Sequence, residues 1–292
     1  MLQSSEIGHQ PSFPDLILCR QHSPILLWLS WQRKCGGYPT AFSVRPNDES
    51  SFQISPSVLT HRRHDEFYLR FAGLSGPKGY TQIERVVPSG FPNLPFQLVY
   101  RYREGGSSFG PSVYQLGLGI FSANTTPPYT SWTRFRPIVQ TGLELLLAAS
   151  DDAGRPKQFA SVALRYIDGF DDRFSQGMPY GKFIESILGF RNKLPESIAR
   201  HVSDDEKVRP HLDIFAPLKN GLQLNLKLAD GQIRGRRAVI METAVSTQRP
   251  VDASIDSTMN ALDSAHEILH SSFMEMSKPL HEVMQPLEEH PG

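Results

Sequence analysis

Alternating apolar positions predict several strands in the middle and late parts of this chain. Residues 112–121 alternate around Tyr114 and Leu116, residues 161–167 alternate in the same way, and residues 222–228 carry a leucine at every second position. Because neighbouring side chains of a strand point to opposite faces, each segment presents one apolar face. The pattern indicates a sheet with one buried side.

Glycine and proline separate the predicted strands and favour short connections between them. Further strands are predicted at residues 67–71, 81–87 and 96–103. A glycine-rich connection at residues 104–110 joins the last of these to the strand that begins at residue 112. Asp230-Gly231 is expected to turn the leucine-rich strand into a partner at residues 232–245. These hairpins predict antiparallel pairing.

Apolar residues at three- and four-residue steps predict two long helices. The first covers residues 131–149, with Ser131 as its N-cap. The second follows Pro250, and Pro279 should bend or end it. Its apolar stripe comprises Met259, Leu262, His266, Leu269, Phe273, Met276, Leu280 and Val283. A shorter helix is predicted at residues 182–190.

These elements predict an α+β fold, an antiparallel sheet covered by an amphipathic central helix and a long C-terminal helix. Residues 1–60 contain six prolines among short apolar runs, so this part is expected to be irregular or poorly ordered. Residues 61–250 form the predicted body, and residues 251–285 form the C-terminal helix that packs on it. No internal repeat is visible in the sequence.

Composition restricts the classes of partner. The chain has 292 residues, of which 39% are hydrophobic and 21% charged, enough to build a globular core. Thirty basic and thirty acidic residues give no net charge, so neither nucleic acid nor an anionic membrane is a predicted partner. Cys19 and Cys35 form no metal or disulfide pattern, so a reducing cytoplasm is expected. The apolar run at residues 25–31 is too short for a membrane span of about 20 residues, and no signal peptide is predicted.

The sequence contains one motif with an enzyme-like mechanism. Residues 266–270 are His-Glu-Ile-Leu-His, an HExxH pattern whose two histidines share a helix face that can hold zinc while Glu267 acts as a base. Against this, His266 belongs to the apolar stripe, where a packed or hydrogen-bonded histidine is the commoner explanation. No metal or other cofactor is therefore predicted, and His266 with His270 remains the alternative metal pair.

Two glycine motifs lack the context that their chemistry requires. Residues 106–110 match GxSxG, but they lie between charged residues and Pro111, without the buried strand and following helix of a nucleophile elbow. Gly117-Leu118-Gly119 hints at a dinucleotide fingerprint, yet Pro127 and Pro128 leave no room for the phosphate-binding helix. A hairpin turn is predicted for the first motif, and nucleotide binding is rejected for the second.

Three clusters of charged residues allow a binding interpretation and a structural one. Asp168, Asp171 and Asp172 around Gly169 could gather a cation, but Asp beside Gly is typical of a turn. Arg234, Arg236 and Arg237 could grip a phosphate, or could protect an edge strand from pairing with another sheet. Residues 61–64 (His-Arg-Arg-His) precede two acidic residues, which favours a solvated face.

A set of separated positions resembles the pattern of a sporadically distributed bacterial protein family of unknown function. The matching positions, between about Tyr80 and Met284, are residues 84–92, Tyr114, Gln115, Leu116, Gly117, Asn124, Tyr129, Trp132, Phe135, Leu164, Arg165, Tyr166, Ile167, Leu262, Asp263, His266 and Phe273. The resemblance implies an accessory bacterial gene of a mobile or defence region. It assigns no role to Tyr114, Gln115, Gly117, Asn124, Tyr129, Trp132, Arg165, Tyr166 or His266.

The chain departs from that family pattern in three places. Asp168 stands where many relatives have Asn, and His270 is not part of the pattern. Relatives open with a proline-led apolar strand of the main sheet, of which residues 23–27 are a faint echo. If that strand is missing, an unpaired sheet edge would need a partner or a second copy to cover it.

The sequence therefore favours an intracellular binding or interaction module, with a protein partner or a homo-oligomer, over an enzyme. The alternative is a zinc-dependent hydrolase that uses His266, Glu267 and His270. A third hypothesis is nucleic-acid binding through Arg234, Arg236 and Arg237.

Overall fold

The computed structural model describes residues 25–30, 58–88, 94, 96–105, 112–125, 131–150, 155–191, 193–204, 207–233 and 235–284, and for residues 25–30 and 58–64 it describes the backbone alone. Nine strands form one antiparallel sheet. In order across the sheet they are β2 (Gln82–Arg85), β3 (Leu98–Arg103), β4 (Ser112–Gly117), β5 (Ile120–Thr125), β1 (Ile25–Ser30), β7 (Ser161–Asp171), β10 (Arg236–Thr247), β9 (Leu222–Ile233) and β8 (Leu212–Pro217). A short pair, β6 (Gln158–Phe159) and β11 (Val251–Asp252), lies beside it.

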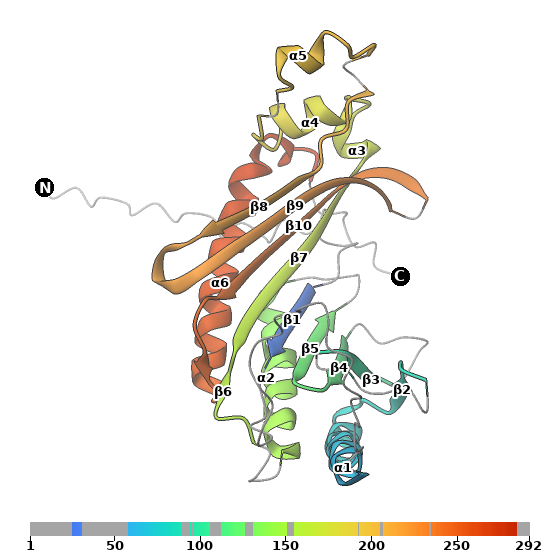
Figure 1. The fold of residues 1–292 in the computed structure, drawn as a ribbon, viewed down its shortest axis with the longest axis vertical. Helices are drawn as coiled ribbons and strands as arrows, with labels where there is room; N and C mark the ends of the chain where they lie inside the picture. The colour runs from blue at the N-terminus through green and yellow to red at the C-terminus, as the bar shows by residue number, and fades with distance from the viewer. Residues whose placement is uncertain are drawn as a thin grey trace, which may run out of the picture.

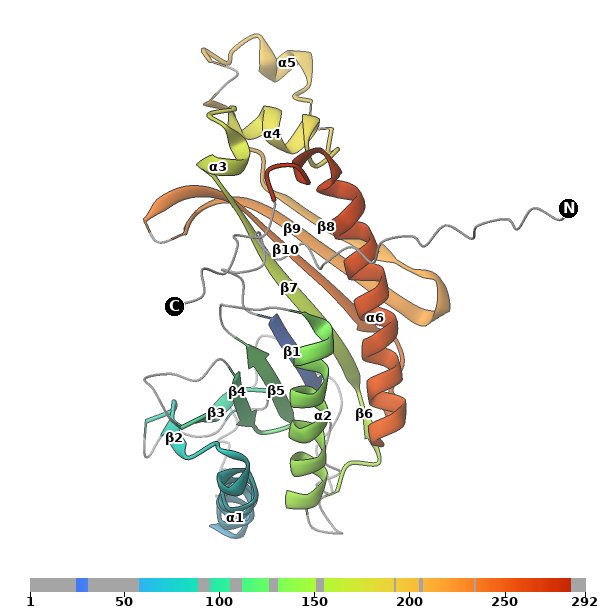
Figure 2. The same ribbon diagram turned by 180° about the vertical axis from the view of Figure 1, so that it is seen from behind.

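The two long helices predicted from the sequence cover one face of this sheet. They are α2 (Trp132–Ala149) and α6 (Ile255–Met276). Figure 1 shows the strands in front of α6, and the reverse view in Figure 2 shows α2 and α6 side by side in front of the strands. The remaining helical segments are α1 (Val58–Ser75), α3 (Asp172–Ser175), α4 (Tyr180–Ser186), α5 (Glu196–Ala199), η2 (Gly76–Lys78), η4 (Lys219–Gly221) and η5 (Lys278–Leu280). The predicted α+β fold is confirmed.

Local sequence explains how both long helices begin and end. The Ser131 side chain accepts a hydrogen bond from the Arg134 backbone at the start of α2, which confirms Ser131 as the N-cap. Ser254 does the same for Ser257 at the start of α6. Helix α6 ends at Met276, and Pro279 lies in the following 3-10 turn, as the sequence predicts.

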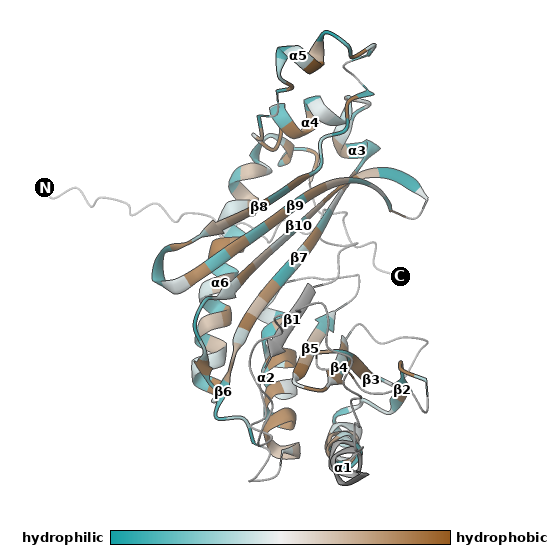
Figure 3. Cartoon of the chain, viewed as in Figure 1, coloured by the Kyte–Doolittle hydropathy of each residue, from teal (hydrophilic) through white to brown (hydrophobic). Residues whose placement is uncertain are grey.

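Side chains that alternate along the strands build the core beneath these helices, and Figure 3 shows the resulting bands of hydropathy along β7 and β9. The larger core lies between α2, α6 and the middle of the sheet and includes Tyr114, Phe121 and Leu164. A second core lies under α3, α4 and the end of α6 and includes Phe170 and Phe183. Helices therefore pack on the sheet through two separate hydrophobic cores.

The two halves of the chain follow the same order of elements. In the first half β1 is followed by α1, then β2 to β5, then α2; in the second half β7 is followed by α3 to α5, then β8 to β10, then α6. The first strand of each half pairs with the last, β1 with β5 and β7 with β10, and β1 pairs with β7 antiparallel at the centre. This arrangement fits an approximate two-fold axis between β1 and β7. The correspondence lies in the order and pairing of the elements and not in the sequence, where no repeat is visible.

The N-terminal segment contains a strand that its proline-rich composition did not lead us to expect. Residues 1–60 were expected to be irregular, but β1 at Ile25–Ser30 pairs with β5 and β7 in the middle of the sheet, and α1 begins at Val58. The unpaired edge expected from a missing strand does not arise here. The rest of that segment lies outside the described residues.

Three local predictions are wrong for identifiable reasons. Residues 67–71 belong to α1, because Phe67 and Phe71 are one helical turn apart and bury the same face. The predicted strand at 112–121 is two strands, β4 and β5, with a turn at Leu118-Gly119, where Gly119 has φ 74°.

The Asp230-Gly231 turn is the third wrong prediction. Both residues lie within β9, opposite Val239 and Ala238, and the chain turns beside Gly235, which has φ 77°. A Cβ at Gly231 would lie 2.6 Å from the Ile240 side chain. Glycine is needed here for close packing rather than for a turn.

Gly117 offers a test of the β3–β4 pairing, in which it lies opposite Leu98. A Cβ at this position would collide with the backbone carbonyl of Gln97, which cannot move aside as a flexible side chain can. We expect Gly117→Ala to lower the free energy of unfolding by about 1–3 kcal/mol. Gly73→Ala, in the exposed last turn of α1 with no atom within 4 Å, is the matched control and should raise stability by about 0.5–1 kcal/mol. Urea unfolding followed by circular dichroism measures both, and equal effects would contradict the assigned contact.

Candidate functional site

Three of the family-pattern residues meet where α2, α6 and β7 come together. Trp132 starts α2, His266 lies in the middle of α6, and Tyr166 lies in β7. The indole and imidazole rings stack with centroids 5.1 Å apart and planes 17° apart. The Tyr166 hydroxyl lies 2.9 Å from His266 Nδ1. Positions far apart in the sequence therefore form one cluster.

Asp263 ties α6 to α2 beside this cluster. Its Oδ1 accepts hydrogen bonds from Trp132 Nε1 at 2.9 Å and from Arg136 Nε at 2.9 Å, and its Oδ2 accepts from Arg136 Nη2 at 2.8 Å. Burial alone would raise the pKa of this carboxyl, but the hydrogen bonds from Arg136 and Trp132 outweigh that effect and hold the pKa below its ordinary value. The carboxylate and the bidentate guanidinium act as a clamp between the two helices.

The HExxH residues do not form an open metal pair in this arrangement. His266 and His270 stack with ring centroids 5.5 Å apart and planes 25° apart, and Glu267 is exposed to solvent. Within the part of the chain that the structure describes, His, Cys, Asp and Glu side chains nowhere form a group of three that could hold a metal ion. The arrangement is that of stacked, hydrogen-bonded helix residues, and the zinc hypothesis stays a prediction.

The acidic cluster after Tyr166 differs from the turn that the sequence predicts. Asp168 is fully buried inside β7, on the helix-covered face between Tyr166 and Phe170, so a turn at this residue is wrong. Asp171 ends the strand and caps α3 by accepting from the Arg173 backbone. The strand continues through Gly169, where a Cβ would collide with the Ile233 side chain. Glycine at position 169 therefore makes room for the Ile233 side chain, as Gly231 does for Ile240.

Two more residues of the family pattern, Asn124 and Gln115, meet on the opposite face of the sheet. Asn124 Nδ2 donates to the Val113 carbonyl at 3.2 Å and to Ser122 Oγ at 3.1 Å. The Gln115 amide satisfies its neighbours when its oxygen faces Arg101, 3.0 Å from Arg101 Nε. This is a second polar cluster, separate from the one around His266.

The other pattern residues have structural contacts or lie outside the described residues. The buried Tyr114 hydroxyl donates to the Ile138 carbonyl at 2.7 Å, and burial raises its pKa. Arg165 pairs with Glu242 at 3.1 Å between β7 and β10. Tyr129, together with the GxSxG residues 106–110, lies outside the described residues.

The arginines of the late hairpin do not protect an edge. Strand β10 lies between β7 and β9, so the predicted edge position is wrong; β8 and β2 are the outer strands of this sheet. Arg237 Nε donates to Asp230 Oδ1 at 3.2 Å, and Asp230 Oδ2 lies 3.2 Å from Arg209 Nε. Arg234 lies outside the described residues. The pairing of Arg237 within its own hairpin leaves the phosphate hypothesis without direct support.

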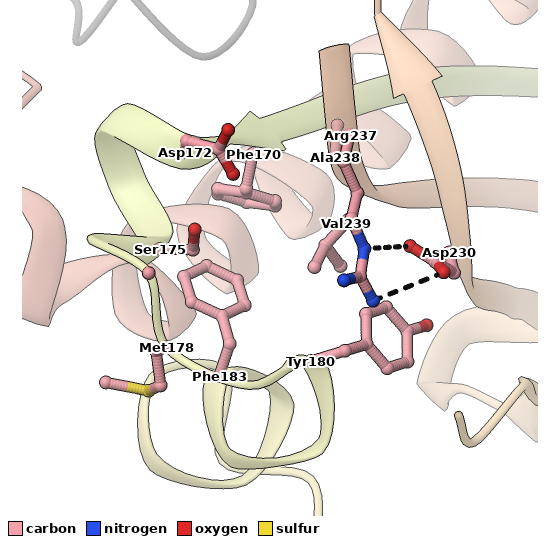
Figure 4. A pocket seen from close by; sticks show the side chains of 11 residues that line it. Phe170, Asp172, Ser175, Met178, Tyr180, Phe183, Asp230, Arg237, Ala238 and Val239 are labelled. Atoms are coloured by element: carbon pink, nitrogen blue, oxygen red, sulfur yellow. Dashed lines mark hydrogen bonds and ion pairs between the residues drawn. The ribbon is translucent and has the colours of Figure 1, made fainter. Parts of the chain in front are cut away.

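A cavity of about 160 Å³ lies between the α3–α4 segment and the β9–β10 hairpin. Figure 4 shows aromatic rings on one side of it and the Asp230–Arg237 ion pair on another. Its lining comprises Phe170, Asp172, Ser175, Gly177, Met178, Tyr180, Phe183, Asp230, Arg237, Ala238 and Val239. The Tyr180 hydroxyl is buried and has no hydrogen-bond partner among the described residues. An unsatisfied buried hydroxyl at a cavity is unusual in a folded protein.

The amino-acid sequence did not predict this cavity. Its lining comes from three separate segments, and no motif joins them. The only partial indication was the short helix predicted at residues 182–190, which the structure places at Tyr180–Ser186.

Comparisons with known proteins add no family to this picture. No protein-family model matches the chain, and searches of curated proteins and of solved structures find no match either. The family resemblance therefore stays a prediction. Among the described helices, none combines the length and apolar character that a membrane span requires.

The Asp263 clamp predicts a dependence of stability on pH. Because the pKa of Asp263 is depressed in the folded state, its contribution is present above the ordinary carboxyl pKa of 3.8 and is lost as the pH falls through the lower folded value. We expect Asp263→Asn to cost about 1 kcal/mol at pH 7, allowing for solvent screening of this partly exposed pair, and to cost less near pH 3, below the ordinary carboxyl pKa. Glu267→Gln, exposed on the same helix, is the control and should change little at either pH. Thermal melts at the two pH values measure this, and a cost that does not vary with pH would contradict the clamp.

Proposed function

We propose that this protein is an interaction module that holds a partner protein by inserting one of the partner's side chains into the cavity beside Tyr180. The size of the cavity carries this proposal. Pockets for drug-sized ligands measure roughly 300–1,000 Å³, whereas a cavity of about 150 Å³ holds a benzene-sized group. A volume of about 160 Å³ suits a single side chain better than a cofactor or an extended substrate.

The distribution of apolar and polar groups supports the same function. Phe170, Phe183 and Val239 are buried and supply apolar walls, whereas Asp172 and Arg237 are exposed at the rim. Interfaces concentrate their binding energy where an anchor side chain enters an apolar pocket, surrounded by polar groups that exclude water. The cavity has this composition on a small scale.

The proposal extends to the cellular setting. In this proposal the protein acts in the cytoplasm, belongs to the accessory bacterial family that its sequence resembles, and needs no cofactor. The zero net charge of the chain supports a protein partner over nucleic acid. A second copy of this chain is a particular case of the partner.

The zinc-hydrolase alternative has a direct test. The proposed function predicts that protein purified without chelator holds no stoichiometric zinc that depends on His266, because the His, Cys, Asp and Glu side chains of the described residues form no group of three that could hold a metal ion. Elemental analysis of the wild type and of His266→Ala measures this. One zinc per chain, lost in the variant, would establish the hydrolase hypothesis instead.

Filling the cavity tests the interaction function. Ser175 lines the cavity and is partly buried, so Ser175→Trp should occupy the space that the partner's side chain needs. In cross-linked complexes purified from the protein's own host, we expect the partner to decrease at least about tenfold, which corresponds to a loss of about 1.4 kcal/mol. Ser264→Trp, on the exposed side of α6, is the control and should keep the partner. A partner retained equally by both folded variants would contradict binding at this cavity.

A further inference from the structure

The strand β8 forms one outer edge of the sheet, and Figure 1 shows β2 at the opposite edge. Among the described residues, only β9 pairs with β8, and residues 212–217 make no backbone hydrogen bond outside that pairing. An edge of this kind presents a row of unpaired backbone N–H and C=O groups. Another strand can pair with it.

The two halves of the chain show which element would occupy this position. Counting outward from the central pair β1–β7, the first half runs β1, β5, β4, β3, β2, whereas the second half runs β7, β10, β9, β8. Strand β8 therefore corresponds to β3. In the first half β2 pairs antiparallel with the outer edge of β3, but the described part of the second half has no counterpart of β2. The position beside β8 is thus open to one antiparallel strand.

The two outer strands also differ in how their sequences protect them. Strand β2 has four residues, of which Glu84 and Arg85 are charged. Short length and charge are devices that keep edge strands from pairing. Strand β8 has six residues, of which only Asp213 is charged, and Phe215 in its middle is 65% exposed. Strand β8 lacks the protection that β2 has.

We propose that β8 pairs antiparallel with β8 of a second copy of this chain, across a two-fold axis, so that the two sheets join into one. This dimer is a second interaction of the protein, separate from the cavity beside Tyr180. The symmetry restricts the register, because opposite residues of antiparallel strands point to the same face of a sheet. A register in which Phe215 lies opposite Phe215 of the second copy meets this condition.

This register suits the side chains of β8. An aromatic pair lies at the axis, where directly opposite rings stabilise antiparallel strands. Asp213 lies opposite Pro217 of the second copy, so the two Asp213 carboxylates are roughly 13 Å apart along the strands, at about 3.4 Å per residue. The neighbouring register, with Ile214 opposite itself, would bring them to roughly 7 Å by the same rise. Repulsion between the carboxylates therefore favours Phe215 at the axis.

Sedimentation velocity of the full-length protein, from micromolar to submillimolar concentration, tests the dimer. One short strand per copy gives a small interface, so we expect a reversible dimer whose population rises with concentration. Phe215→Asp places like charges opposite each other at the axis and should weaken the dimer at least about tenfold. Ile83→Asp, on the other outer strand and at a residue that is 49% exposed, is the matched control and should leave the affinity unchanged.

Cysteine cross-linking tests the register. In a chain that carries Cys19→Ser and Cys35→Ser, Phe215→Cys should form a disulfide-linked dimer in air, because its two copies meet at the axis. Asp213→Cys, on the same face of the same strand, is the control and should not cross-link, because it faces Pro217 of the second copy.

Three results would overturn the proposal. They are a protein that stays monomeric at every concentration, a dimer that Phe215→Asp leaves as strong as before, and equal cross-linking of the two cysteine variants. A β8 edge that pairs only with a strand of a different protein would give the first result. Ser175→Trp, which fills the cavity, should leave the dimer intact, so the failure of this proposal and the failure of the proposed function are distinguishable.

Discussion

The requirement that α2 and α6 bury their apolar stripes on one face of the sheet determines the rest of this structure. Both helices follow the last strand of a meander, so each returns across the strands that precede it. Asp263 then joins the two helices through Trp132 and Arg136, and the Tyr166–His266 contact attaches α6 to the central strand β7. The residues that looked most like a functional signature thus hold the two halves together. Their separation in the sequence reflects the connectivity of the halves.

The two halves differ where function is proposed. Among the described residues of the first half, the 18-residue helix α1 follows the first strand and packs Phe67 and Phe71 into the main core. The second half places three short helices at the same point, and they cover the end of the sheet with a separate core. The cavity lies between those helices and the β9–β10 hairpin.

Sequence patterns predicted the elements whose signal is periodic and local. The α2 and α6 stripes and the Ser131 cap required no knowledge of tertiary contacts, and the antiparallel strands followed from alternation. Failures occurred where glycine serves packing: Gly231 and Gly169 make room for Ile240 and Ile233 instead of marking turns. Strand β1 had only a faint indication in the sequence, at residues 23–27, because proline-rich surroundings hide a short apolar segment whose stability comes from pairing on both sides. The cavity could not be predicted, since its walls meet only after the sheet forms.

The most direct test of the proposed function is hydrogen–deuterium exchange on the protein alone and in complex with any protein that co-purifies with it from its host. Because an anchor side chain in the cavity would stabilise the α3–α4 segment and the facing hairpin, we expect new protection at residues 172–186 and 228–240. Protection confined to other parts of the protein, or exchange that the partner leaves unchanged, would contradict the claim that this cavity is the binding site.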